Sequence, residues 1–133
     1  MIPAAPVAGT AAARSFPGTP AYLAAARSFV CSCLPASCPR RDDAALVISE
    51  LATNAVLHSA SGLPGGSYQV QVDLGAHAVE VTVIDQGPAS VPVPARRPDG
   101  EGGFGLGLVA ELADAYDSRP GPAGRTVWCR LDW

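Results

Sequence analysis

The feature that most constrains this chain is a long helical segment near its middle, at residues 42–59. Its apolar residues recur at intervals of three and four, the spacing that one buried face of an α-helix requires. Glu50, Asn54 and His58 follow one another every four residues, so a helix stacks them on one side. A carboxylate and a carboxamide are poor core residues, so this polar row indicates a chemical role. The predicted core stripe consists of Leu46, Val47, Leu51, Ala55 and Val56.

The polar row has the donors of a metal–nucleotide site. Asn54 offers a neutral oxygen to a hard cation, and Glu50, one turn earlier, offers a base. Each residue also has a simpler explanation, Asn54 as a capping or surface amide and Glu50 as a solvated carboxylate. His58 lies near the predicted end of the helix, where the helix dipole favours it, so we assign it a structural role.

Shorter patterns predict the elements around this helix. A first helix is expected at residues 20–34, with Thr19 as its N-cap and Pro20 at its first position. A third helix is expected at residues 106–115, and strands at residues 13–16, 68–74, 79–84 and 126–131. An α/β two-layer sandwich, in which about three helices cover one face of a mixed β-sheet, would bury these stripes.

Composition excludes several classes of protein. With 48% hydrophobic and 16% charged residues, the chain is expected to form one domain over residues 11–133, after a loose N-terminus at residues 1–10. The net charge of −3 argues against direct nucleic-acid binding. No apolar run has the length of a membrane span, and the N-terminus lacks a secretory signal, so a cytoplasmic protein is expected.

A cysteine cluster at Cys31, Cys33 and Cys38 raises the alternative of a metal or redox site. Its spacing differs from the C-x-x-C pair usual for zinc, and no His lies nearby in the sequence. Ordinary thiols in a reducing cytosol are the favoured interpretation.

Two glycine motifs follow the central helix. Asp85-Gln86-Gly87-Pro88 ends a predicted strand, and Gly103-Phe104-Gly105-Leu106-Gly107 precedes a predicted helix. An Asx turn would explain the first, and an ordinary loop-to-helix junction the second. Exposed backbone N–H groups at a helix start are also a natural phosphate site.

In order and spacing, the three motifs resemble those of the GHKL ATPase superfamily, which includes gyrase-type ATPases, sensor histidine kinases and bacterial anti-sigma serine kinases. Glu50-Leu51-x-x-Asn54-Ala55-x-x-His58 resembles its N box, and the two glycine motifs resemble its glycine boxes. The resemblance covers residues 16–128 and implies a Bergerat-type ATP-binding fold. The small size makes the chain most similar to stand-alone anti-sigma serine/threonine kinases.

The resemblance implies ATP and Mg²⁺ as cofactors. Asn54 would ligate the metal, Glu50 would be the catalytic base, and Asp85 would accept the adenine amino proton. The other nucleotide-binding residues would be Gly87, Gly103, Gly105, Leu106, Gly107 and Thr126. For Thr126, a simple preference for strands is the alternative.

A lid at residues 89–102 would cover the nucleotide. It carries Arg96 and Arg97, and one of them would reach the γ-phosphate. The alternative is that both side chains are exposed and solvated. The lid is short and Pro-rich for the family, and Phe104 stands where related kinases often carry a polar or basic residue. Either departure is compatible with ATP binding with little turnover.

Three functions remain open from the sequence. The first is a serine/threonine kinase that acts on an anti-anti-sigma protein or binds a sigma factor. The second is a non-catalytic, nucleotide-gated regulator, and the third is a histidine-kinase-like fragment. The joint presence of Glu50 and Asn54 favours the first, and the lack of a phospho-accepting helical hairpin in this chain argues against the third. A homodimer is left open.

Overall fold

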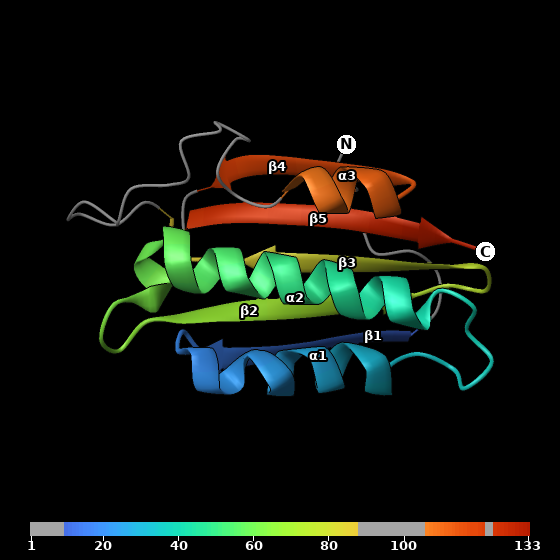
Figure 1. The fold of residues 1–133 in the computed structure, drawn as a ribbon, viewed down its shortest axis with the longest axis horizontal. Helices are drawn as coiled ribbons and strands as arrows, with labels where there is room; N and C mark the ends of the chain where they lie inside the picture. Colours follow the sequence, from blue (N-terminus) through green and yellow to red (C-terminus); the bar gives the residue numbers. More distant parts are fainter. Residues whose placement is uncertain (1–9, 88–105, 122–123) are drawn as a thin grey trace.

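The computed structural model describes residues 10–87, 106–121 and 124–133 and shows a two-layer α/β sandwich (Figure 1). In chain order, with η for a 3-10 helix, the elements are β1 (Thr10–Pro17), η1 (Pro20–Tyr22), α1 (Leu23–Ser32), α2 (Arg41–His58), η2 (Ala60–Gly62), β2 (Ser67–Leu74), β3 (Ala78–Ile84), α3 (Leu106–Leu112), β4 (Ala115–Gly121) and β5 (Gly124–Asp132). The strands form one sheet in the order β1-β2-β3-β5-β4, and the three α-helices lie together on one face of it. The predicted sandwich is confirmed.

The sheet differs from the prediction in one respect. All four pairings among the described strands are antiparallel, whereas a mixed sheet was expected. Short connections explain two of the four pairings: β2 and β3 are joined through three residues, and β4 and β5 through two. Such short connections allow hairpins, while a parallel pair requires a long crossover.

The central helix forms close to its predicted bounds, at Arg41–His58 instead of 42–59. Its buried residues follow the three- and four-residue spacing of one helix face. They are Ala44, Val47, Ile48, Leu51, Ala52 and Ala55. Leu46 was expected in this stripe but is 49% exposed, because it lies on the solvent side of the helix. The first helix begins with the 3-10 turn η1, for which Thr19 is the N-cap without a side-chain hydrogen bond.

Strand β4 is the element that the sequence pattern failed to predict. Residue 115 was expected to end the third helix, but α3 ends at Leu112 and Ala115 begins a strand that pairs with β5. The strand contains Pro120 and little apolar alternation, which is tolerated because it lies at the edge of the sheet. At the other edge, Thr10 already pairs with Leu74, and the expectation for residues 1–9 lies outside the described part of the chain.

The two faces of the sheet carry different kinds of side chain. The face beneath the helices is apolar and includes Val70, Val72, Val79, Val81, Val83, Val127, Cys129 and Leu131. Because side chains alternate along a strand, Glu80, Thr82 and Trp128 project to the opposite face, yet they are 3%, 7% and 3% exposed. Two of these three join through a hydrogen bond from Trp128 Nε1 to Glu80 Oε1, 2.7 Å long.

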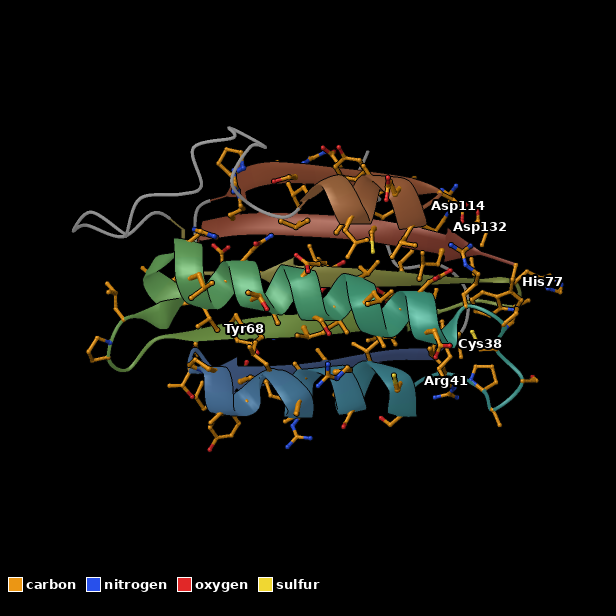
Figure 2. All side chains as sticks on the ribbon, in the orientation of Figure 1. Cys38, Arg41, Tyr68, His77, Asp114 and Asp132 are labelled. Atoms are coloured by element: carbon orange, nitrogen blue, oxygen red, sulfur yellow. The ribbon has the colours of Figure 1, made fainter. Side chains whose placement is uncertain are left out.

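Arg40 joins three elements at one end of the molecule. Its guanidinium contacts the carboxylates of Asp43 and Asp114 at 2.8 and 3.0 Å. It also donates to the carbonyl oxygens of Leu112 and Asp132 at 2.6 and 2.7 Å. Figure 2 shows Asp114 and Asp132 side by side there, and the backbone N–H of Asp132 donates to Asp114 Oδ2 at 2.7 Å. Arg40 thereby holds the end of α3 against the start of α2.

Candidate functional site

The polar row of the N-box-like segment lies on the flank of α2 that faces α3. Asp43, Glu50 and Asn54 are separated by seven and four residues, so they share one side of the helix. Arg40 donates hydrogen bonds both to Asp43 and to the carbonyl oxygen of Leu112, the last residue of α3. The side of α2 that carries Asp43 is therefore the side that faces α3. Glu50 and Asn54 therefore project toward the α3 side.

The opposite flank of α2 faces α1. There, Arg27 of α1 donates a hydrogen bond to Ser49 Oγ at 3.4 Å. Figure 1 shows α2 lying between α1 and α3. Glu50 and Asn54 are both half-buried, so each keeps part of its side chain accessible to a ligand. The structure thus brings the two predicted residues together, one turn apart, on an accessible side of the helix.

Asp85 lies directly after β3 and is 8% exposed. Its Oδ1 accepts the backbone N–H of Gly87 at 2.7 Å, which is the Asx turn considered from the sequence, and that of Arg125 at 3.3 Å. Within the described parts of the chain, no hydrogen bond engages its second oxygen, Oδ2. One carboxylate oxygen therefore holds the turn, while the other is left for a ligand.

The turn after Asp85 depends on two glycines. Gly87 has φ +76°, a conformation that residues with a Cβ rarely adopt. Gly124 has φ +143°, and a Cβ there would lie 1.9 Å from the carbonyl oxygen of Asp85. Gly87 and Gly124 must therefore both lack a Cβ for the turn to form as it does. Sequence reasoning found Gly87 but missed Gly124, whose signal was a glycine immediately before an alternating strand.

Two buried serines link the end of α2 to the first glycine motif, and sequence reasoning missed both. Ser61 Oγ accepts the backbone N–H of Gln86 at 2.9 Å. Ser59 Oγ accepts the N–H of Ser61 at 3.0 Å and donates to the carbonyl of Ala55 at 2.7 Å. Since the N–H of Ala60 also donates to the carbonyl of Gly87 at 2.7 Å, the helix of Asn54 and the turn of Asp85 form one connected unit.

The second glycine motif is partly described. Leu106 and Gly107 form the first turn of α3, and Leu106 is half-buried while Gly107 is exposed. Predictions for Gly103, Phe104 and Gly105 lie outside the described residues, as do those for the lid at residues 89–102 with Arg96 and Arg97. His58 is the last residue of α2, the position expected for a structural role.

A comparison with family models decides the class of protein. The model described as histidine kinase-like ATPase domain matches residues 16–131, which include the polar row of α2 and both glycine motifs. The chain belongs to this family. Membership makes ATP the implied ligand of the site. No curated protein matches the chain.

In this histidine kinase-like ATPase domain, Thr126 is not brought to the side of Asp85. Thr126 pairs with Ile84, while Asp85 itself is hydrogen-bonded to Arg125. Because neighbouring positions of a strand face opposite ways, the side chain of Thr126 starts from the other face of the sheet. Its place near the adenine stays a prediction.

The ATPase domain offers oxygen donors for Mg²⁺. Among the described residues, no group of three or more His, Cys, Asp or Glu is placed to hold a metal. Mg²⁺ does not require such a group, since it commonly takes one or two protein oxygens together with phosphate oxygens and waters. The accessible amide of Asn54 fits that requirement as a neutral ligand.

The cysteines lie apart from this chemistry. All four are free thiols. Burial raises the pKa of Cys129 to about 12, and burial also raises the pKa of Cys33. Both thiols are therefore protonated and poorly nucleophilic at neutral pH. None of the helices in the described ranges is long and apolar enough to cross a membrane.

Proposed function

We propose that this ATPase domain is an ATP-dependent protein serine/threonine kinase of the anti-sigma type. Its substrate would be an anti-anti-sigma protein, and a sigma factor is the second partner class. Both partners act in the cytoplasm, which is the proposed location. The observation that carries the proposal is the placement of Glu50 and Asn54, one turn apart, on the accessible flank of α2 facing α3.

Each residue has a role in phosphoryl transfer. Glu50 takes the proton from the serine or threonine hydroxyl of the substrate, and that oxygen attacks the γ-phosphorus of ATP. The bond between the γ-phosphorus and the β,γ-bridging oxygen breaks, and ADP leaves. Asn54 would be a ligand of Mg²⁺, and the bound metal would neutralise part of the phosphate charge. Asp85 selects the base by accepting a hydrogen bond from the adenine amino group.

The kinase is tested by replacing Glu50 with Gln, which keeps the size of the side chain and removes its charge. We expect Glu50→Gln to keep or slightly improve ATP affinity, because a negative charge near the phosphates is lost. Single-turnover transfer to the partner should fall roughly a hundredfold or more, the scale of general-base losses. Glu111→Gln is the matched control, since Glu111 is an exposed carboxylate of α3 and should retain full transfer.

Two outcomes would change the conclusion. An unchanged transfer rate in Glu50→Gln would remove Glu50 from the mechanism. Wild-type protein that transfers no phosphate but binds its partner in a nucleotide-dependent way would instead identify a non-catalytic regulator. Acid-stable label on the partner marks phosphoserine or phosphothreonine, whereas phosphohistidine is acid-labile.

A further inference from the structure

The sheet register places Arg125 beside Asp85. Val83 and Ile84 of β3 pair with Val127 and Thr126 of β5. The ladder continues for one more pair beyond the strand, because the backbone N–H of Asp85 donates to the carbonyl oxygen of Arg125 at 2.9 Å. The N–H of Arg125 returns a hydrogen bond to Asp85 Oδ1 at 3.3 Å. These two residues are therefore direct neighbours across the strands.

Strand alternation assigns the side chains to faces. Val83 and Val127 are 2% and 7% exposed and belong to the core beneath the helices. Asp85 and Arg125 lie two positions beyond them, so their side chains start from that same face. Thr126 starts from the opposite one. The residue adjacent to Asp85 on the ligand side of the sheet is thus an arginine.

The chemistry of adenine makes this neighbour significant. On the six-membered ring, the amino group that donates to Asp85 is next to N1, which is a hydrogen-bond acceptor. A carboxylate can satisfy the amino group, but N1 requires a donor. A guanidinium offers five N–H donors and is charged at all relevant pH values.

We propose that Arg125 donates a hydrogen bond to N1 of the adenine ring and, with Asp85, determines the selectivity of the site for the base. The proposal rests on the binding of ATP with its base at Asp85. It assigns the second base contact to Arg125 in place of Thr126. The amino group and N1 are adjacent on one edge of the ring. Asp85 accepts a hydrogen bond from the amino group, and Arg125 donates one to N1.

The test compares ATP with 1-deaza-ATP, which carries C–H in place of N1 and is otherwise the same ligand. Wild-type protein should bind ATP about tenfold to a hundredfold more tightly than 1-deaza-ATP, the scale of a hydrogen bond from a charged donor. Arg125→Met should bind the two nucleotides within about twofold of each other, because the donor is gone while the aliphatic stem is kept. Arg119→Met makes the same change at an exposed arginine of β4, so it is the matched control and should retain the wild-type preference. Calorimetric titration gives all six affinities.

The outcomes separate this inference from the proposed function. Tight ATP binding with equal affinity for 1-deaza-ATP in the wild type would overturn the role of Arg125 and leave ATP binding intact. Equal losses for both ligands in Arg125→Met would place the guanidinium on another part of the nucleotide and would also overturn it. Failure of folded wild-type protein to bind either ligand at millimolar concentration would refute nucleotide binding itself. If Arg125→Met does not fold, Arg125→Gln provides the same comparison with a shorter, neutral side chain.

Discussion

Trp128 and Glu80 form a buried hydrogen bond, 2.7 Å from the indole Nε1 to the carboxylate Oε1, on the sheet face away from the helices. Trp128 belongs to β5 and Glu80 to β3. The same two strands carry Arg125 and the residue before Asp85. The bond therefore joins the two strands at whose ends lie the residues proposed to bind the base, and it does so from the opposite face of the sheet.

Trp128→Phe should lower the free energy of unfolding by about 2 kcal/mol or more, because it leaves a buried carboxylate without its donor. Urea denaturation at neutral pH measures the loss. In the double variant with Glu80→Leu, the carboxylate is also removed, so the combined loss should be smaller than the sum of the two single losses. Simple additivity would show that the bond contributes nothing.

Tyr68→Phe should leave the free energy of unfolding unchanged or raise it by up to about 1 kcal/mol. The hydroxyl of Tyr68 is buried and has no hydrogen-bond partner among the described residues, and burial raises its pKa, so it is neutral. Removing an unsatisfied hydroxyl removes a desolvation cost. Tyr68→Ala is the contrasting variant, because it also deletes the ring that stacks on Phe16 at 5.9 Å and should cost about 3 kcal/mol or more. A large loss for Tyr68→Phe would reveal a missed partner of the hydroxyl.

Gly124→Ala should abolish ATP binding and lower the free energy of unfolding by more than about 2 kcal/mol. The new Cβ would lie 1.9 Å from the carbonyl oxygen of Asp85, where backbone must move. Gly65→Ala is the control for backbone strain without a clash. Gly65 also has a positive φ, +79°, but no atom lies within 4 Å of the added Cβ. Thermal unfolding and nucleotide titration of both variants check the contrast. Equal behaviour would mean that strain alone decides the result.

Asp114→Asn should change the response of stability to acid. The backbone N–H of Asp132 and the guanidinium of Arg40 hold the pKa of Asp114 below its usual value. A carboxyl whose pKa is lower in the folded state stabilises it above the unfolded pKa, and this contribution disappears as pH falls through the folded pKa. The variant should therefore be less stable than wild type at pH 7, and the difference should shrink below about pH 4.

The effect of Asp114→Asn should be modest, because solvent screens a partly exposed carboxylate. Urea denaturation at a series of pH values measures it. Asp42→Asn, which changes an exposed carboxylate at the start of α2, is the control. A difference between wild type and Asp114→Asn that stays constant down to pH 2 would contradict the linkage.

Asn54→Ala should weaken the binding of Mg-ATP about tenfold or more, while affinity for ATP in the presence of a chelator changes less than about twofold. The reason is that a ligand of the metal contributes only when the metal is bound. Thr53→Ala, at the neighbouring half-buried position of α2, is the matched control and should change neither affinity. Equal weakening with and without metal would give Asn54 a direct contact with the nucleotide.

The central helix and its polar row could be predicted because their information is local. Periodic apolar residues specify which face of α2 is buried, and their spacing predicts that Glu50 and Asn54 share one side of the helix. The turn at Asp85 and Gly87 was local in the same sense, since an Asx turn needs only neighbouring residues. Strand β4 was missed because its stability comes from pairing with β5 and not from its own composition.

The contacts that complete the site depend on segments far apart in the sequence. Ser61 reaches Gln86 across 25 residues, and Arg125 reaches Asp85 across 40. A shift of one residue in the register of β5 would exchange Arg125 and Thr126 between the two faces of the sheet. The alternation of β5 indicates which of its residues share a face, but it does not say which strand lies beside them. The sequence alone therefore determined the family motifs and the helix that presents them. The pairing of β3 with β5 in the folded chain decided which side chain of β5 stands next to Asp85.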